Sequence, residues 1–333
     1  MRRIPWAALL LLLSAAHITC CLRYAWAGML ADNDTVAALH RATQLEPQNA
    51  AYFSRLAALD PEHQAVWLET ALKLHPTDAV LWIERGVHQE ISGDPEAAEA
   101  DLLEAARRDH QYVPRWTLAA FYFRQHHVAK FQAAARQALE MAWGDALPLF
   151  QMAAQLGMTL DDVRRTMLPD RAPVLAAFVS ECLRRNNLEE TLRTTRRLVE
   201  IGAPDDRSTA LAPIDALFRA GQTGGAVELW NRLADRHWIP HPAIHPAALI
   251  PNPDFSLPFL PAGFDWHPSI VDGVVFWRLG AGHGLQVEIS GRQPESCTLL
   301  TLPLPLNAAR KYALHIQASG VPAGAGLKWK LGT

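Results

Sequence analysis

The chain has 333 residues, of which 50% are hydrophobic and 20% are charged, so it has ample apolar material for packed cores in two modules. Its formal net charge is −3, and the arginine pairs Arg107/Arg108, Arg164/Arg165 and Arg196/Arg197 stand among acidic residues, as is typical of solvated helix faces. This balance argues against nucleic acid as a partner, because such binding depends on a basic surface.

Residues 1–31 predict a signal peptide or an N-terminal membrane anchor. Arg2 and Arg3 precede an uncharged run from Ile4 to Leu22, and these 19 residues approach the roughly 20 that cross a bilayer. Ala25-Trp26-Ala27 offers small residues for a signal peptidase, so cleavage after Ala27 and retention as an anchor both stay open. Either outcome predicts an exported chain, periplasmic or anchored in the inner membrane and facing the periplasm.

Residues 34–237 show a repeating helical pattern. Trp82 and Trp116 are 34 positions apart, each inside a helical pattern. If Trp82 is the fourth position of a repeat, small or apolar residues fall at positions 8, 20, 24 and 27, namely Gly86, Ala98, Leu102 and Ala105. This spacing resembles the tetratricopeptide repeat (TPR), in which two helices cross where Gly86 and Ala98 would meet.

The resemblance implies a right-handed α-solenoid whose groove binds a protein or peptide. It also implies that Tyr52, Trp82 and Trp116, with Ala120, pack between repeats rather than contact a ligand. The repeat before Trp82 is shortened near Asp60-Pro61, since Pro47 and Pro76 are only 29 positions apart. Beyond Trp116 the pattern decays, yet helices are still predicted at 145–156, 160–167, 173–186, 188–201, 210–220 and 224–237.

The composition changes after His237. Residues 238–248 contain three prolines, which exclude a helix and predict an extended spacer. His237, His241 and His245 recur every four residues, a metal-ligand spacing only in a helix, so no metal site is expected. From 249 to 333, apolar and polar residues alternate in short runs, as in 284–289 and 311–318, which predicts the strands of a small antiparallel β-sandwich.

This C-terminal region resembles galactose-binding-like jelly-roll modules of carbohydrate-active proteins. The resemblance lies in Asn252-Pro253-Asp254-Phe255 followed by Gly263-Phe264-Asp265-Trp266. Pro253 and Ser256 depart from the family motif at a glycine and an acidic residue. The region is also short for such a module, which implies an incomplete jelly roll. Trp266 and Trp277 are candidate glycan contacts, with core packing as the alternative.

No phosphate-binding loop, nucleophile elbow or paired metal motif occurs in the sequence, so we expect no catalytic residue, cofactor or metal and no enzyme activity. The predicted fold is mainly α, a TPR-like solenoid followed by the β-sandwich. The arrangement resembles exported bacterial repeat proteins of envelope or exopolysaccharide assembly. It predicts a scaffold that binds protein partners through the solenoid. The alternative is a carbohydrate-binding protein that acts through the C-terminal module.

Overall fold

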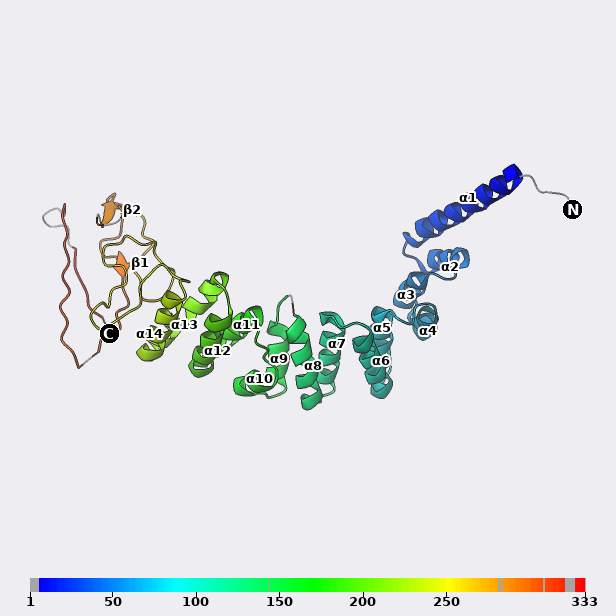
Figure 1. Ribbon diagram of the computed structural model, residues 1–333, viewed down its shortest axis with the longest axis horizontal. Coiled ribbons are helices and arrows are strands. Elements are labelled where there is room, and N and C mark those ends of the chain that lie inside the picture. Colours follow the sequence, from blue (N-terminus) through cyan, green and yellow to red (C-terminus); the bar gives the residue numbers. More distant parts are fainter. Residues whose placement is uncertain are drawn as a thin grey trace. The chain divides into compact units, whose positions relative to one another are not determined.

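The structure is a computed structural model that describes residues 6–142, 144–280, 282, 284–307, 309–320 and 327–332. The chain divides into two compact units, Met1–Ala216 and Leu217–Thr333, which are treated separately below. The described residues form mainly helices, with short strands near the C-terminus (Figure 1). The helices of the first unit are α1 Trp6–Ala31, α2 Val36–Leu45, α3 Ala50–Leu59, α4 Gln64–Leu74, α5 Ala79–Ile91, α6 Pro95–Arg108, α7 Tyr112–Arg124, α8 Val128–Met141, α9 Leu147–Gln155, α10 Leu160–Thr166, α11 Ala172–Arg184 and α12 Leu188–Ile201.

The first unit is a series of helix pairs. The closest contacts join α1 to α2, α3 to α4, α5 to α6, α7 to α8 and α11 to α12. Further contacts join α5 to α7, α7 to α9 and α9 to α11, and others join α8 to α10, so helices of like position meet along the series. We call α3, α5, α7, α9 and α11 the first helices and α4, α6, α8, α10 and α12 the second helices. This stacking confirms the predicted helical repeats at the level of helix pairs.

The helix starts follow from local capping chemistry. Side-chain oxygens of Asn49, Asp78 and Asp94 accept hydrogen bonds from backbone N–H groups in the first turns of α3, α5 and α6. Each of these helices therefore begins with one of its unpaired donors satisfied. The α5–α6 turn also contains Gly93 at φ 87°, a left-handed conformation that costs glycine little.

The shortened repeat has its own turn. A 3₁₀ turn, Pro61–His63, connects α3 to α4, which have 10 and 11 residues against 13 and 14 in α5 and α6. The Asp60 carboxylate accepts hydrogen bonds from Trp67 Nε1 (3.1 Å) and from the His63 ring (3.0 Å), and these bonds lower the pKa of Asp60. The residues missing from this repeat thus come from both helices, and Asp60 fixes the turn between them.

The N-terminal helix continues into the first helix pair. Ala27 and Ala31, near the end of α1, are completely buried in an apolar cluster with Leu39 and Ala42 of α2. The Arg55 guanidinium of α3 donates to the Ala31 carbonyl (2.5 Å). The helical series therefore begins before residue 34, where the sequence pattern placed its start.

The boundary between the units lies within α13 (Arg207–Arg219), which follows a 3₁₀ turn, Pro204–Asp206. The second unit contains α14 (Thr223–Asp235) and then a long segment without regular structure. Its strands are β1 His267–Pro268, β2 Val274–Arg278, β3 Leu285–Ile289 and β4 Leu300–Thr301. In the described residues, β2 pairs antiparallel with β3 from Val274↔Ile289 to Arg278↔Leu285, and β1 pairs with β4.

The segment 238–248 differs from the expected spacer. The Trp230 indole of α14 donates to the Pro242 carbonyl (3.0 Å), and the Asn231 side chain bonds both the N–H and the carbonyl of Ile244. The prolines do prevent a helix, but the segment bends and turns beside α14 and supplies it with hydrogen-bond partners. The segment is part of a packed structure.

The C-terminal region also differs from the expected sandwich. Residues 311–318, predicted as a strand, have no ladder partner among the described residues and are exposed throughout. In the run 296–302, the strand is limited to Leu300–Thr301. Two separate two-stranded ladders form in the described residues, and no sandwich or jelly roll results.

Candidate partner-binding surfaces

The residues predicted to pack between helices lie in the interior of the first unit or at its edge. Ala98, Leu102 and Ala105 of α6 are completely buried, and Tyr52 and Ala120 are nearly so. A Cβ placed on Gly86 of α5 would stand 3.0 Å from Leu102 Cγ and 3.2 Å from the Ala98 carbonyl oxygen. Trp82 and Trp116 are partly buried and lie at the margins of the apolar clusters.

Trp82 is also held by polar groups. Its Nε1 donates to the Pro76 carbonyl (2.8 Å), and the guanidinium carbons of Arg85 and Arg108 lie 4.7 and 5.2 Å from its ring. Arg85 in turn forms a two-bond ion pair with the buried Asp101 carboxylate, at 2.6 and 2.7 Å. With its ring beside two cations and its N–H satisfied, Trp82 joins α5 to α6 rather than presenting a free indole.

A first candidate surface runs along the first helices. Val80, Glu84, Val87 and Ile91 follow the i, i+4, i+7, i+11 spacing and share one side of α5, opposite the side on which Gly86 meets α6. Val80 and Ile91 are 56% and 81% exposed, and Val113, near the start of α7, is 53% exposed. We call these five residues, with Ser54 and Arg124, the first-helix face. Isolated exposed apolar side chains are ordinary, but here they occur on two first helices that contact each other.

Polar bonds join neighbouring first helices along this face. Ser54 Oγ of α3 donates to Glu84 Oε2 of α5 (2.8 Å), and Arg124 of α7 binds both oxygens of Glu90 of α5, at 2.8 and 2.6 Å. Burial raises the pKa of Glu84, against the opposing effect of the Ser54 hydrogen bond. These bonds fix the spacing of α3, α5 and α7, so the face is held in one shape before any partner arrives.

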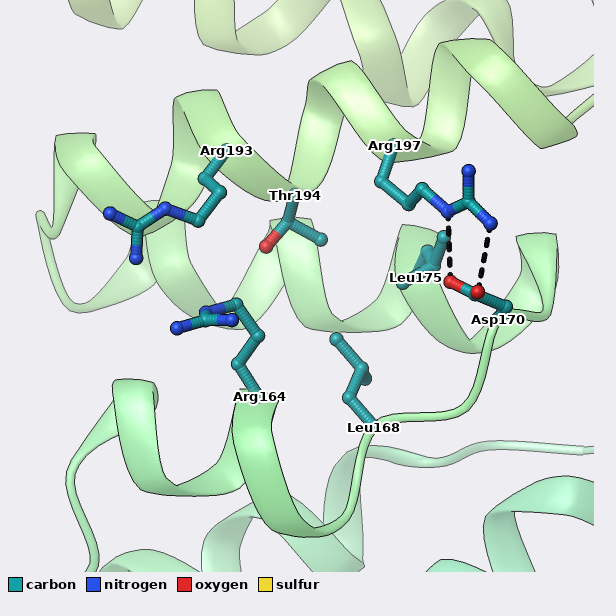
Figure 2. Close-up of a pocket in the computed structure, with 7 residues that line it drawn as sticks. All are labelled: Arg164, Leu168, Asp170, Leu175, Arg193, Thr194 and Arg197. Carbon is teal, nitrogen blue, oxygen red and sulfur yellow. Dashed lines mark hydrogen bonds and ion pairs between the residues drawn. The ribbon is translucent and has the colours of Figure 1, made fainter.

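A second candidate surface is a cleft of about 230 Å³ between α10, the loop that follows it, α11 and α12 (Figure 2). It is lined by Arg164, Leu168, Asp170, Leu175, Arg193, Thr194 and Arg197. The cleft exists because α10 has 7 residues, whereas α6, α8 and α12 have 14 each. A short second helix leaves part of the neighbouring α12 uncovered.

The charges around this cleft are organised into ion pairs. Arg197 binds both oxygens of Asp170, at 2.9 and 2.8 Å, as Figure 2 shows. Arg164 and Arg193 both bind the buried Glu190 carboxylate, at 3.0 and 2.5 Å. Thr194 is 2% exposed, and its hydroxyl oxygen has no hydrogen-bond partner among the residues that the structure describes. A buried polar group of this kind is uncommon.

Sequence patterns alone hardly indicated this cleft. Arg164/Arg165 and Arg196/Arg197 were interpreted only as solvated helix faces. The one available signal was the shortness of the helix predicted at 160–167 beside longer neighbours.

In the second unit the two candidate glycan contacts differ in exposure. Trp266 is buried, its Nε1 donates to the Asn252 carbonyl (2.7 Å) and its ring lies 4.9 Å from that of Phe255. It therefore has no free face for a sugar. Trp277 of β2 is 55% exposed and stands directly across the ladder from Gln286. One exposed indole thus lies beside a polar side chain.

The motif Asn252 to Trp266 builds the interior of this unit. The Asp265 carboxylate accepts from the Leu260 N–H (2.8 Å) and from the Asn252 side chain (3.3 Å), and it lies 3.1 Å from His241 Nε2. Burial opposes ionisation of Asp265, but His241 and the backbone donors outweigh it and lower its pKa. Among the described residues, no three His, Cys, Asp or Glu side chains are grouped as metal ligands.

One further feature concerns α1. The stretch Leu9–Ala31 is long and apolar enough to cross a membrane, with a mean hydropathy of 1.5 in its most apolar window. Leu9 to Leu13, Ile18 and Leu22 are all exposed. Among the described side chains of α1, that of Ala27 is the first to be buried.

Comparison with protein-family models gave no match, nor did comparison with curated proteins. Solved structures with similar helical arrangements include TPR proteins. YrrB, a TPR protein with an unusual peptide-binding site, aligns over 61% of this chain and 93% of its own, with 12% identity and a TM-score of 0.31. PilW, a type IV pilus biogenesis factor, aligns over 65% of this chain and 93% of its own, with 14% identity and a TM-score of 0.31. The description of the helix pairs therefore rests on the contacts within this chain and not on these similarities.

Proposed function

We propose that this protein is a non-enzymatic scaffold that binds a protein or peptide through the first-helix face. The observation that carries the proposal is the exposure of Val80 and Ile91 on α5 and of Val113 on α7, with the half-buried Val87 between the first two, on helices already fixed by the Ser54–Glu84 and Glu90–Arg124 bonds. A partner segment gains apolar contact there at little cost in ordering the scaffold. Peptide binding by YrrB is consistent with this use of helical repeats.

The test compares two arginine substitutions at equally exposed valines. Val80→Arg alters the first-helix face, whereas Val66→Arg alters the second helix α4, and both valines are 56% exposed. Each variant, and the wild type, is used to recover partners from detergent-solubilised membranes of the native host. We expect Val80→Arg to lose partners that Val66→Arg retains, because a cation would enter an apolar contact. Equal recovery by both variants would contradict the proposal.

We further propose that the scaffold is exported and stays tethered to the membrane through α1, in the assembly of the cell envelope or its exopolysaccharide. The packing of Ala27 and Ala31 against α2 supports retention over cleavage, since a cut after Ala27 would remove most of α1 from the α1–α2 pair. The 17 helical residues from Trp6 to Leu22 span about 25 Å, close to the apolar thickness of a bilayer.

Membrane extraction tests this tether. The native protein should resist alkaline carbonate, dissolve in detergent, and yield peptides from residues 9–27 in mass spectrometry. A mature chain that begins at Gly28 and is recovered without detergent would contradict the tether. It would leave the proposal for the first-helix face untouched.

A second candidate function, glycan binding by the C-terminal unit, is favoured by one observation, the exposed Trp277 beside Gln286. An indole face can stack on a sugar ring while neighbouring amides bond its hydroxyls. Trp277→Ala should abolish retention on immobilised exopolysaccharide of the host, whereas Trp329→Ala, at another exposed tryptophan, should not. Equal retention by both variants would argue against this function.

A further inference from the structure

The cleft in Figure 2 has the features of a built binding site. The Thr194 hydroxyl is buried, unpartnered and directed into the cleft, so a ligand atom there would satisfy it. The apolar side chains of Leu168 and Leu175 form another part of the wall. A volume of about 230 Å³ is below the size of drug-sized ligand pockets and suits a single inserted side chain.

The surrounding charges decide which chemistry fits. The guanidinium groups of Arg164 and Arg193 are bound by Asp161, Glu189 and Glu190, and that of Arg197 is bound by Asp170 and Glu200. Asp161 also binds Arg165, so the charges around the cleft are already paired with one another. An additional anion would meet the carboxylates that bind these guanidinium groups, and an additional cation would meet the guanidinium groups that line the wall. An uncharged ligand group avoids both penalties.

Hydrogen-bonding capacity remains after these ion pairs. A guanidinium carries five N–H donors, and the carboxylates around Arg193 and Arg197 accept only some of them. A ligand therefore needs a carbonyl oxygen to accept from arginine, and a donor or acceptor for the Thr194 hydroxyl. A primary amide supplies both, and its methylene stem suits Leu168 and Leu175.

We propose that this cleft is a second peptide-binding site, which takes the asparagine or glutamine side chain of a partner segment. The proposal rests on the proposed function in that the partner is a polypeptide, but the cleft shares no lining residue with the first-helix face. Binding there would hold a partner at two places on the scaffold, and the short α10 is the element that opens the site.

The experiment uses the full-length protein in detergent micelles to select binders from a phage-displayed library of random peptides. Selected peptides are then measured by fluorescence anisotropy against the wild type, Thr194→Val and Ile91→Arg. Thr195→Val is the matched control, because the neighbouring Thr195 hydroxyl is buried on the same helix but already donates to the Thr191 carbonyl (2.7 Å).

We expect one class of peptides to share an asparagine or glutamine and to bind Thr194→Val about fivefold more weakly, the loss of one hydrogen bond. The same peptides should bind Ile91→Arg and Thr195→Val as they bind the wild type. Thr194→Val should not lower the Tm, since it removes an unsatisfied buried hydroxyl, whereas Thr195→Val should lower it.

Two results would overturn the proposal. One is a selection in which no peptide is weakened by Thr194→Val, including a selection that yields no binder. The other is a sensitive class that requires aspartate or glutamate, which would make the cleft an anion site. Failure of the first-helix face would show separately, as an absence of peptides weakened by Ile91→Arg.

Discussion

Residue 86 must be small because α5 and α6 approach each other closely there. Its absent Cβ lets α5 approach Leu102 and Ala98 of α6, and the tetratricopeptide resemblance placed a small residue at this crossing. In the second unit, Asp265 acts mainly through hydrogen bonds, since Asn252 and the Leu260 N–H donate to its buried carboxylate and His241 lies beside it. Single residues thus fix the geometry of both units, one by size and one by hydrogen bonding.

We expect Gly86→Val to destabilise the first unit by about 2 kcal/mol, because the added methyl groups would overlap Leu102. Chemical denaturation followed by circular dichroism measures this. The control is Gly224→Ala in α14, where a Cβ would meet nothing within 4 Å, so it should be neutral or slightly stabilising. Equal effects at the two glycines would contradict the role of close approach.

Asp265 predicts an acid dependence of the second unit. Because the folded state lowers the pKa of this carboxyl, its contribution to stability is complete above the ordinary pKa near 4 and is lost as the pH falls through the lower folded value. Thermal unfolding followed by tryptophan fluorescence between pH 6 and about 2 should show this loss. Asp265→Asn should be less stable at neutral pH and should lack the loss. A variant with the acid profile of the wild type would disprove the assignment.

At the scale of the elements, the lengths of two helices, α10 and α1, bear on the proposed functions. The 7-residue α10 opens the cleft on α12, and the 26-residue α1 is long enough to serve both as a membrane span and as part of the first helix pair. The β2–β3 hairpin, by contrast, is short, and an isolated two-stranded hairpin is at best marginally stable in water, so it depends on favourable local conformations. Gly273 provides one of them at its start, where φ is 76°.

Gly273→Ala should unfold the β2–β3 hairpin while leaving the helices intact. A Cβ at this position would lie 2.6 Å from Ser290 Oγ and 2.9 Å from Arg292 Cβ, and alanine also disfavours the positive φ. Hydrogen exchange of the amides in 274–278 measures the change. Protection equal to that of the wild type would show that the hairpin tolerates the added carbon.

For the whole molecule, the division into units predicts where the chain can be cut. The sequence pattern ended the helical region at His237. The structure shows that Trp230 and Asn231 of α14 depend on Pro242 and Ile244, which lie beyond that point. The unit that contains α14 therefore continues through the segment that the prolines suggested was only a connection.

A chain that ends at His237 should consequently melt at a lower temperature and expose more apolar surface than one that ends at Pro268. The shorter chain leaves the Trp230 indole without its acceptor and opens the region around it. Differential scanning fluorimetry of both chains in the same detergent tests this. Identical melting curves would mean that α14 is stable without the segment 238–268.

The sequence by itself determined the helices, their caps and the small residues at the α5–α6 crossing, because periodicity, capping chemistry and side-chain size act over a few neighbouring positions. It also determined that α1 is apolar enough to cross a membrane. Only the tertiary structure decided that Ala27 belongs to the first helix pair, that Trp266 is buried while Trp277 is exposed, and that Thr194 opens onto a cleft with three arginines. These features depend on contacts between residues distant in sequence, and in the part of the chain that the structure describes the alternating segment 311–318 lacks such a contact to complete a sheet.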